Sequence, residues 1–488
     1  MSGTALLGLI MLIVMIGAIF IGFPISFTLL FLAFAFGYFG LGGHTVFDLA
    51  YFQTIGMMKE ELLAAVPLFI FMGFITEQAG LMERLFTAFR LLLAPVRGAL
   101  FLVVILTATV FAMATGIVGA AVTVLGIMAS PIMIKTGYDA KLSAGCITAG
   151  GTLGILIPPS VMLIVMGPVI GVSVAELYSA AFGPGFLLAG IYLAYLMTRA
   201  FINPKLGPPV PMDERVNSLG ALVWEVAIGV VPLLLLISAV LGSMLAGLAT
   251  PTEASAIGAF GAALLAIAYR RLSFAGLKRA VLSTTATSSM VLLLAMTSNI
   301  FGAVFSRLGT ATWITETMLA LPFGPVEMLL LVLAIIFILG WPFEWPAIIL
   351  VFLPIFYPVV EALKPALGQS LGIAPDMVMI WFGAVVAVTL QTAFLSPPVA
   401  MSAYYLRQVV REWSLATIYK GMFEFMVLQC IAIALIIVFP RIVTYLPDQL
   451  RSDIASEKVE QIDDSQNRLE EDPFKSIQEE SGAAKEEK

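Results

Sequence analysis

GTLGILIPPSVML, residues 151–163, and LQTAFLSPPVAMS, residues 390–402, are two apolar segments that are each interrupted by a pair of adjacent prolines. Proline lacks a backbone N–H, and its ring clashes with the preceding helical turn. A helix that crosses lipid therefore tolerates such a pair only where the freed backbone groups meet protein, water or a ligand. Two interruptions in similar surroundings, 239 residues apart, predict a pair of broken membrane helices that form a binding site.

The composition places these segments in a membrane protein. Of 488 residues, 60% are hydrophobic and 11% are charged, whereas soluble domains contain roughly 25% charged residues. Apolar runs recur along the chain at lengths near the ~20 residues that cross a lipid bilayer. We therefore expect an all-α polytopic membrane protein with no nucleic acid as partner. Because the initial apolar stretch lacks a basic leader, we expect no cleavable signal.

Few residues of the chain suit metal or redox chemistry. Cys146 and Cys430 both lie in apolar segments, which disfavours a disulfide framework or a structural metal site. His44 is the single histidine, so a histidine-based metal centre is disfavoured as well. The sequence predicts no cofactor other than an ion bound by oxygen atoms.

The net charge of −6 is concentrated at the C-terminus. Residues 447–488 contain 13 acidic and 6 basic residues, a net −7, and the preceding 446 residues have 18 acidic and 19 basic ones, a net +1. The tail is polar and has no hydrophobic period, so we expect it to be disordered or a loose surface helix. Docking of a partner is the alternative for this tail.

The proline pairs belong to a longer internal repeat. Three other pairs of segments match in the same order: 23–40 with 250–267, 75–86 with 297–309, and 129–134 with 352–357. Their offsets indicate one duplicated unit with an insertion of about sixteen residues near 362–377. The expected organisation is a first repeat (1–203), a linker (204–221), a second repeat (222–446) and the acidic tail (447–488).

Each repeat reads as the same series of helices. Two spanning helices come first (4–21 and 24–40; 222–246 and 252–269), followed by a helix that turns into a surface arm (65–97; 280–321). A helical hairpin (98–136; 325–362), a broken helix (142–170; 376–408) and a last span (183–203; 418–440) complete the unit. If the hairpin enters and leaves on one side, each unit crosses the membrane five times, and the second copy is inverted.

Basic residues favour this inversion. With the N-terminus outside, fifteen Lys and Arg residues before the tail fall on the inner face and four on the outer face, a strong positive-inside bias. One loop contains Arg270, Arg271, Lys278 and Arg279, and the corresponding loop of the other copy, 41–58, contains no Lys or Arg. Inverted repeats with broken helices are typical of secondary transporters.

Broken helices can bind an ion and an organic acid with few charged side chains. Unwound backbone presents carbonyl oxygens to Na⁺, and the N-terminus of a half-helix presents N–H groups to a carboxylate. The first candidate site combines the hairpin bend at Thr115 and Gly116 with Gly151, Thr152, Ile155, Pro158 and Ser160. The second combines the bend from Gly340 to Glu344 with Thr389, Gln391, Thr392, Ser396 and Pro397.

We expect Na⁺ to draw each bend against its facing break, which completes a pocket for the substrate carboxylate. The candidate substrate contacts are Thr115, Thr152, Ser160, Glu344, Gln391 and Ser396. Small residues in these segments also have a simpler explanation, since Gly and Thr let membrane helices pack closely. Glu344 is either a coupling group or a hydrated residue at the outward mouth, and Glu253 fits a capping box with Thr250 better than a substrate contact.

Four segments together resemble a known family: PLFIFMG (67–73), GTLGILIPPS (151–160), ATPTEASAIG (249–258) and FLSPP (394–398). They resemble the large membrane subunit of tripartite ATP-independent periplasmic (TRAP) transporters over roughly residues 1–445. The resemblance implies a Na⁺-coupled elevator transporter for small organic acids in the inner membrane of a bacterium or archaeon. It also implies two partners, a small four-helix membrane subunit and a periplasmic substrate-binding protein.

The resemblance also implies positions for two sodium sites within a mobile domain of hairpins and broken helices. The first would contain Thr115 and Gly116 with the segment from Gly151 to Pro158, including Thr152 and Ile155. The second would contain Gly340 with the segment from Thr389 to Pro397, including Thr392 and Leu395. Ala114 and the pair Glu344-Trp345 depart from the usual family pattern, which puts side-chain ligation in doubt at those two bends.

Other functions remain as alternatives. A carrier of related architecture that works alone, for dicarboxylates or for anions such as arsenite, is the main one. An intramembrane enzyme needs an Asp pair, a Ser–His or Ser–Lys set or a metal cluster, and the broken segments contain none of these. A channel is disfavoured because two inverted sites suit alternating access better than a continuous pore.

Overall fold

The computed structural model describes residues 3–208, 219–397 and 400–452, and the secondary structure in these ranges is entirely helical. Ten helices within them are long and apolar enough to cross a membrane. The predicted all-α polytopic membrane fold is therefore confirmed.

The first half of the chain forms twelve helical elements in the described ranges. They are α1 (Gly3–Ile21), α2 (Ile25–Leu41), α3 (Thr45–Met58), η1 (Glu61–Ala64), α4 (Ala65–Gln78), α5 (Leu81–Leu93), α6 (Ala99–Thr115), α7 (Val118–Lys135), α8 (Ala140–Thr152), η2 (Leu153–Ile155), α9 (Val161–Ile170) and α10 (Val174–Ile202). We call α6 and α7 hairpin 1, and residues 153–160 break 1.

The second half of the chain forms thirteen helical elements in the described ranges. They are α11 (Leu219–Leu245), α12 (Pro251–Ala268), α13 (Phe274–Arg307), α14 (Thr310–Leu319), α15 (Pro325–Leu339), α16 (Trp345–Ala347), η4 (Ile348–Phe352), α17 (Leu353–Leu371), η5 (Pro375–Met377), α18 (Val378–Gln391), η6 (Thr392–Phe394), α19 (Met401–Val409) and α20 (Leu415–Val438). We call α15 to α17 hairpin 2, and residues 392–397 break 2.

Side-chain caps begin several of these helices, and the sequence predicts the one at Thr250. The hydroxyl of Thr250 accepts from the N–H of Glu253, whose carboxylate accepts from the N–H of Thr250, so the capping box at the start of α12 is confirmed. Asp139 caps α8 and Ser414 caps α20 in the same manner, each accepting from a backbone N–H three residues on. These caps satisfy N–H groups that a helix start leaves without a partner.

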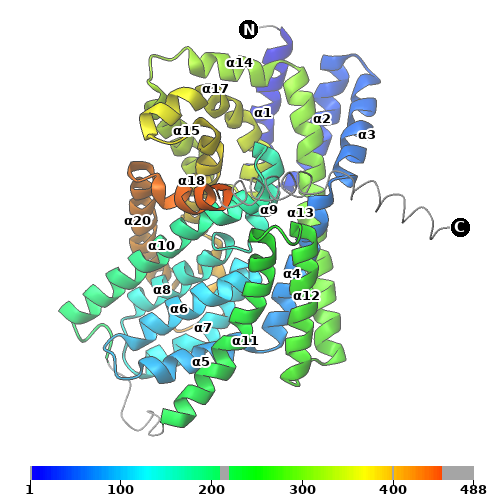
Figure 1. Ribbon diagram of the computed structural model, residues 1–488. Coiled ribbons are helices and arrows are strands. Elements are labelled where there is room, and N and C mark those ends of the chain that lie inside the picture. The colour runs from blue at the N-terminus through cyan, green and yellow to red at the C-terminus, as the bar shows by residue number, and fades with distance from the viewer. Residues whose placement is uncertain (1–2, 209–218, 398–399, 453–488) are drawn as a thin grey trace, which may run out of the picture.

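The helices divide into two groups. Helices α11, α12 and α13 pack against α5, α4 and α2, and with α1, α3 and α14 we call this group the frame. Helices α8, α10, α18 and α20 pack together between the two hairpins, and we call this group, α6 to α10 with α15 to α20, the body. In Figure 1 the frame helices α2, α3, α12 and α13 run along one side, and α20 lies on the other.

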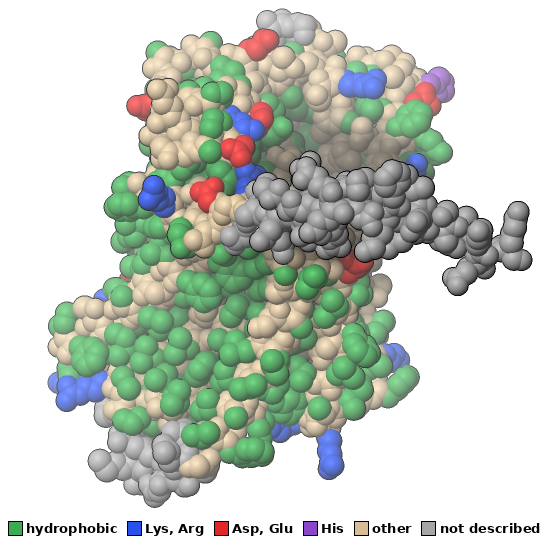
Figure 2. Space-filling model, in the orientation of Figure 1, with side chains coloured by type: hydrophobic (Ala, Val, Ile, Leu, Met, Phe, Trp, Pro, Cys, Tyr) green, Lys and Arg blue, Asp and Glu red, His purple; other side chains and the backbone are tan. Residues whose placement is uncertain are grey.

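The outer surface of the molecule suits a lipid environment. Large apolar side chains such as Phe27, Phe31, Phe260 and Val438 are exposed. Figure 2 shows hydrophobic side chains gathered over the lower half of this view, with Lys and Arg side chains near its lower margin. An apolar surface bounded by basic groups is typical of a membrane-spanning protein.

Two boundaries differ from those predicted. Helix α10 begins at Val174, not near 183, and continues through Pro184. Its glycines explain the error, because Gly183 and Gly185 serve close packing against Ile442 and Ile157 and do not start the helix. The beginning of the acidic tail is helical, since residues 441–452 continue as one helix, and residues 453–488 lie outside the described ranges.

Candidate functional site

Hairpin 1 places its bend directly against break 1. Gly116 ends α6 in the left-handed conformation, with φ of +61°, which a glycine adopts without strain. A methyl group on Gly116 would lie 3.6 Å from the carbonyl oxygen of Pro159 and 3.8 Å from that of Gly154. Two carbonyl oxygens of the break and the backbone nitrogen of Val161, at 3.7 Å from the same point, thus lie close to the bend.

Hairpin 2 meets break 2 in a comparable way. A methyl group on Gly340 would lie 3.2 Å from the side chain of Ala393, within the short 3₁₀ helix η6 of the break. Both broken helices thus shift from α-helix to one 3₁₀ turn, break 1 after Thr152 and break 2 after Gln391. The two bends and the two breaks are brought together in pairs, as the sequence predicts.

The hydroxyl groups in the breaks are buried and donate to their own backbone. Thr152 donates to the carbonyl of Ala149 at 2.8 Å, and Thr392 donates to that of Thr389 at 2.7 Å. Four other hydroxyls donate to carbonyls four or five residues before them: Thr115 to Phe111, Ser160 to Ile155, Thr389 to Val385 and Ser396 to Thr392. Each oxygen keeps lone pairs that can accept or ligate.

The remaining predicted contacts differ in their surroundings. Gln391 is fully buried, and neither atom of its amide has a hydrogen-bond partner in the described part of the chain. Glu344 is half-buried and does not cap the short helix α16 that follows it. Pro397 is exposed while Pro158 is buried. Pro398 and Val399 lie outside the described residues.

An ion-pair cluster joins three body helices at one end of α10. The carboxylate of Glu424 on α20 pairs with Lys141 on α8 and lies 3.7 Å from the guanidinium of Arg199 on α10. The hydroxyl of Tyr195 donates to the same carboxylate and accepts from Arg199 at 2.7 Å. We call this group the Glu424 cluster. The sequence assigned both Lys141 and Arg199 to the inner face.

A second ion-pair cluster lies at the other end of α10. Arg451 donates to Glu176, in the first turn of α10, and to Asp376 of η5. Burial opposes the charge on the guanidinium, but the two carboxylates outweigh it and raise the pKa of Arg451. Glu176 and Arg199 are separated by about 35 Å along the helix, roughly the thickness of a bilayer. The two clusters therefore fasten the body at opposite ends.

The frame touches the body at the bend of hairpin 1. A methyl group on Gly73 of α4 would lie 2.7 Å from the carbonyl oxygen of Thr115, so a side chain has no room there. On the other side of the body, α13 of the frame packs against α16 and η4 of hairpin 2. The frame therefore contacts the body close to both bends.

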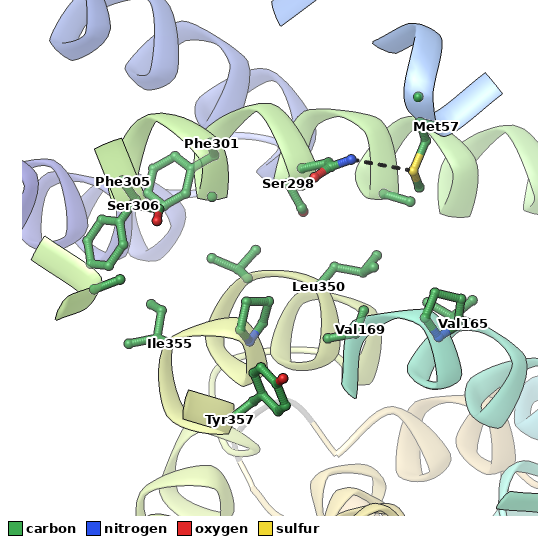
Figure 3. A pocket seen from close by; sticks show the side chains of 18 of the residues that line it. Met57, Val165, Val169, Ser298, Phe301, Phe305, Ser306, Leu350, Ile355 and Tyr357 are labelled. Carbon is green, nitrogen blue, oxygen red and sulfur yellow. Dashed lines mark hydrogen bonds between the residues drawn. The ribbon is translucent and has the colours of Figure 1, made fainter. Parts of the chain in front are cut away.

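A cavity of about 540 Å³ lies between the frame and the body. Figure 3 shows Phe301 and Phe305 of α13 on one side and Leu350, Ile355 and Tyr357 on the other. Glu60, Ser298, Asn299 and Ser306 add polar groups to its walls. None of the residues that the sequence predicts to bind Na⁺ or substrate lines this cavity. The cavity could not be predicted from the sequence, because its walls come from helices that are far apart along the chain.

Two buried polar residues beside break 1 were missed from the sequence. Tyr192 of α10 and Gln429 of α20 are both fully buried, and neither has a hydrogen-bond partner of regular geometry in the described structure. A polar residue on the buried face of an apolar helix was the available signal. It could not be used without knowing which face is buried.

Comparison with known proteins gives a consistent result. The family model of the tripartite ATP-independent periplasmic transporter, DctM component, matches residues 11–442. The chain is 28% identical to the sialic acid TRAP transporter large permease protein SiaM of Vibrio cholerae, covering 89% of this chain and 96% of that protein. It is 27% identical to the ectoine TRAP transporter large permease protein TeaC of Halomonas elongata, covering 90% and 98%.

Two more proteins extend the comparison. The C4-dicarboxylate TRAP transporter large permease protein DctM of Pseudomonas aeruginosa is 29% identical, with 80% of this chain and 85% of that protein covered. Among solved structures, the crystal structure of the Alcanivorax borkumensis YdaH transporter matches with a TM-score of 0.56 and 18% identity, covering 80% of this chain and 87% of that one. That likeness concerns the fold alone.

Proposed function

This chain belongs to the DctM-component family of TRAP transporters as a large permease subunit, and we propose that it imports an organic acid together with Na⁺. The resemblance based on the four sequence motifs is thereby confirmed. Because these relatives are permeases, the prediction of a transporter rather than an enzyme is confirmed too.

One observation supports Na⁺ coupling above the others, namely the convergence of two break 1 carbonyl oxygens on Gly116. Na⁺ is a hard cation that prefers oxygen ligands, and neutral carbonyl and hydroxyl oxygens suffice where half-helix ends add their dipoles. Thr115 and Thr152 supply hydroxyl oxygens at the same bend and break. In the proposal, Gly340, Thr389, Thr392 and Leu395 provide the corresponding oxygens at break 2.

The proposed substrate contacts lie at the same two breaks. Ser160 directly precedes α9, so the N–H groups of the first turn of that half-helix face an incoming carboxylate in the proposal. Gln391 is buried with both amide atoms unpaired, and a substrate carboxylate or hydroxyl would provide its missing partner. Substrate binding would thus offset the free-energy cost of burying the Gln391 amide without hydrogen-bond partners.

An elevator movement of the body against the frame completes the proposal. The two ion-pair clusters join α8, α10, α20 and η5, and α18 packs against α10 and α20, which favours movement of the body as one unit. The cavity beside α13 leaves space between frame and body for such a movement. The proposed coupling is that Na⁺ closes each bend on its break before the body crosses the membrane.

The proposed partners are a small membrane subunit and a periplasmic substrate-binding protein, with the complex in the inner membrane. Relatives are named for sialic acid, C4-dicarboxylates and ectoine. These compounds share a carboxylate and differ in size and charge. We therefore propose a carboxylate-bearing substrate as the class, delivered and selected by the binding protein.

Reconstitution tests this function. The permease is placed in liposomes with its small subunit, and the binding protein and a panel of labelled organic acids are added outside. We expect uptake that requires both an inward Na⁺ gradient and the binding protein. Uptake that continues without the binding protein would favour the stand-alone carrier, and uptake that is indifferent to Na⁺ would overturn the coupling.

A further inference from the structure

The face of α20 that packs into the body is apolar except at one position. Its buried residues are Ile418, Gly421, Met422, Phe425, Gln429, Ala432 and Ile436. Gln429 is fully buried, and neither its Oε1 nor its Nε2 has a hydrogen-bond partner in the described structure. A buried amide without partners is costly, and a leucine of similar size would avoid that cost. The presence of Gln429 therefore indicates that its amide has a function in the protein.

Tyr192 of α10 is the polar neighbour of this amide. Its ring packs edge-on against Phe425 with 5.2 Å between ring centroids, one turn of α20 before Gln429. Its hydroxyl lies beside the side chains of Gln429 and Thr152, without a hydrogen bond of regular geometry to either. Three polar side chains from three helices thus meet in an otherwise apolar interior.

Thr152 is the member of this group that belongs to the candidate sodium site. It is the last residue of α8, and its hydroxyl donates to Ala149, so its oxygen can still accept. The final carbonyls of a helix lack donors from the next turn. Tyr192 brings an O–H to the point where α8 gives way to break 1, and the amide of Gln429 lies next to that O–H.

Close packing prevents these two side chains from moving away from the break. A methyl group on Gly421 of α20 would lie 2.1 Å from the carbonyl oxygen of Lys141 on α8, so the two helix backbones touch. A methyl group on Gly185 of α10 would lie 2.7 Å from the side chain of Ile157, within break 1. Both helices are therefore held against α8 and the break by glycine contacts.

We propose that Tyr192 and Gln429 are positioning residues that hold Thr152 and the end of α8 in the geometry that binds Na⁺ at break 1. This inference rests on the proposed function, since it assigns the two residues to the first of the proposed sodium sites. They do not touch the ion. They set its affinity through Thr152.

Sodium activation of uptake in the reconstituted three-component system tests this role. Tyr192→Phe and Gln429→Leu each remove the polar group and keep the shape. We expect each to raise the half-saturating Na⁺ concentration about tenfold, because Thr152 and the end of α8 lose a polar neighbour, with little change in maximal rate. Because Gln429→Leu also removes an unpaired amide, we expect its melting temperature to stay level or to rise.

A control and a double-mutant cycle separate positioning from general stability. Tyr195→Phe removes a hydroxyl one turn along α10 that serves Glu424, and it should leave the half-saturating Na⁺ concentration unchanged. If Gln429 acts through Thr152, adding Gln429→Leu to Thr152→Ala should raise that concentration no further. Two results would overturn the inference while uptake remains Na⁺-dependent. One is a double variant in which the two increases in half-saturating Na⁺ concentration multiply. The other is an unchanged half-saturating Na⁺ concentration in both Tyr192→Phe and Gln429→Leu. Na⁺-independent uptake by the unmodified protein would instead overturn the proposed function.

Discussion

Gly73 lies at a close contact between the frame and the body. The sequence contains it as the last residue of a motif shared with the family, without a reason for glycine at that position. In the structure, even a methyl group there would lie 2.7 Å from the backbone oxygen of Thr115, closer than atoms pack. The glycine is required by a contact between elements that sequence cannot place together.

A substitution at Gly73 should lower transport without changing Na⁺ binding. We expect Gly73→Ala to lower the uptake rate about tenfold, because the bend of hairpin 1 can no longer rest against α4, while Na⁺ binding within the body is retained. Gly17→Ala in α1 is the matched control, since nothing lies within 4 Å of a methyl group there. Normal uptake by Gly73→Ala, measured in proteoliposomes, would contradict a functional contact at this point.

The candidate site could be predicted from the sequence only in part. Proline pairs reveal a broken helix because their effect on the backbone is local, so Ser160 and Thr392 were correctly placed within breaks and Thr152 directly before one. Tyr192 and Gln429 could not be found in this way. A single polar residue in an apolar span becomes informative only when its helix face and its neighbours are known.

At the scale of elements, α20 connects both breaks with the ion-pair cluster at the end of α10. Gln429 lies beside Tyr192, whose hydroxyl neighbours Thr152 at the end of α8. The sulfur of Met426 accepts from Ser396 in break 2 at 3.1 Å, and Glu424 pairs with α8 and α10. One helix thus contacts α8, α10, α18 and α19 of the body. We therefore expect a substitution that disturbs the packing of α20 to destabilise the body.

Loss of the Glu424 charge should loosen this arrangement. We expect Glu424→Gln to lower the free energy of unfolding by about 1 kcal/mol, because Lys141 and Arg199 lose their shared partner while remaining partly solvated. Thermal melting in detergent at low salt measures the change, and high salt should reduce it. Lys364→Gln removes a local pair within α17 and should have no effect. An equal loss in both variants would contradict a special role for the cluster.

Element boundaries show where local signals fail. The capping box at Thr250 was predicted correctly because cap chemistry depends on neighbouring residues. The start of α10 was misplaced because glycine and proline near 183–185 normally end helices. Here tertiary packing against Ile157 and Ile442 uses the glycines, and the helix continues through them.

At the scale of the whole molecule, hydropathy predicts the helices along the chain, whereas it does not predict the division into frame and body. Packing of α11 and α12 against α5 and α4 joins segments about 150 to 190 residues apart. Hydropathy reports that each helix is apolar and does not say which apolar helices meet. The cavity between α13 and the body depends on the same packing, so it could not be predicted from the sequence either.

The central claim is that the two bends and the two breaks form sodium sites, one in each half of the chain. Equilibrium binding of radioactive Na⁺ to the purified permease measures this directly, in the unmodified protein and in Thr152→Ala and Thr392→Ala. We predict saturable binding of two ions per chain, with each substitution weakening one of them. Absence of saturable Na⁺ binding, or binding that neither substitution changes, would contradict the account.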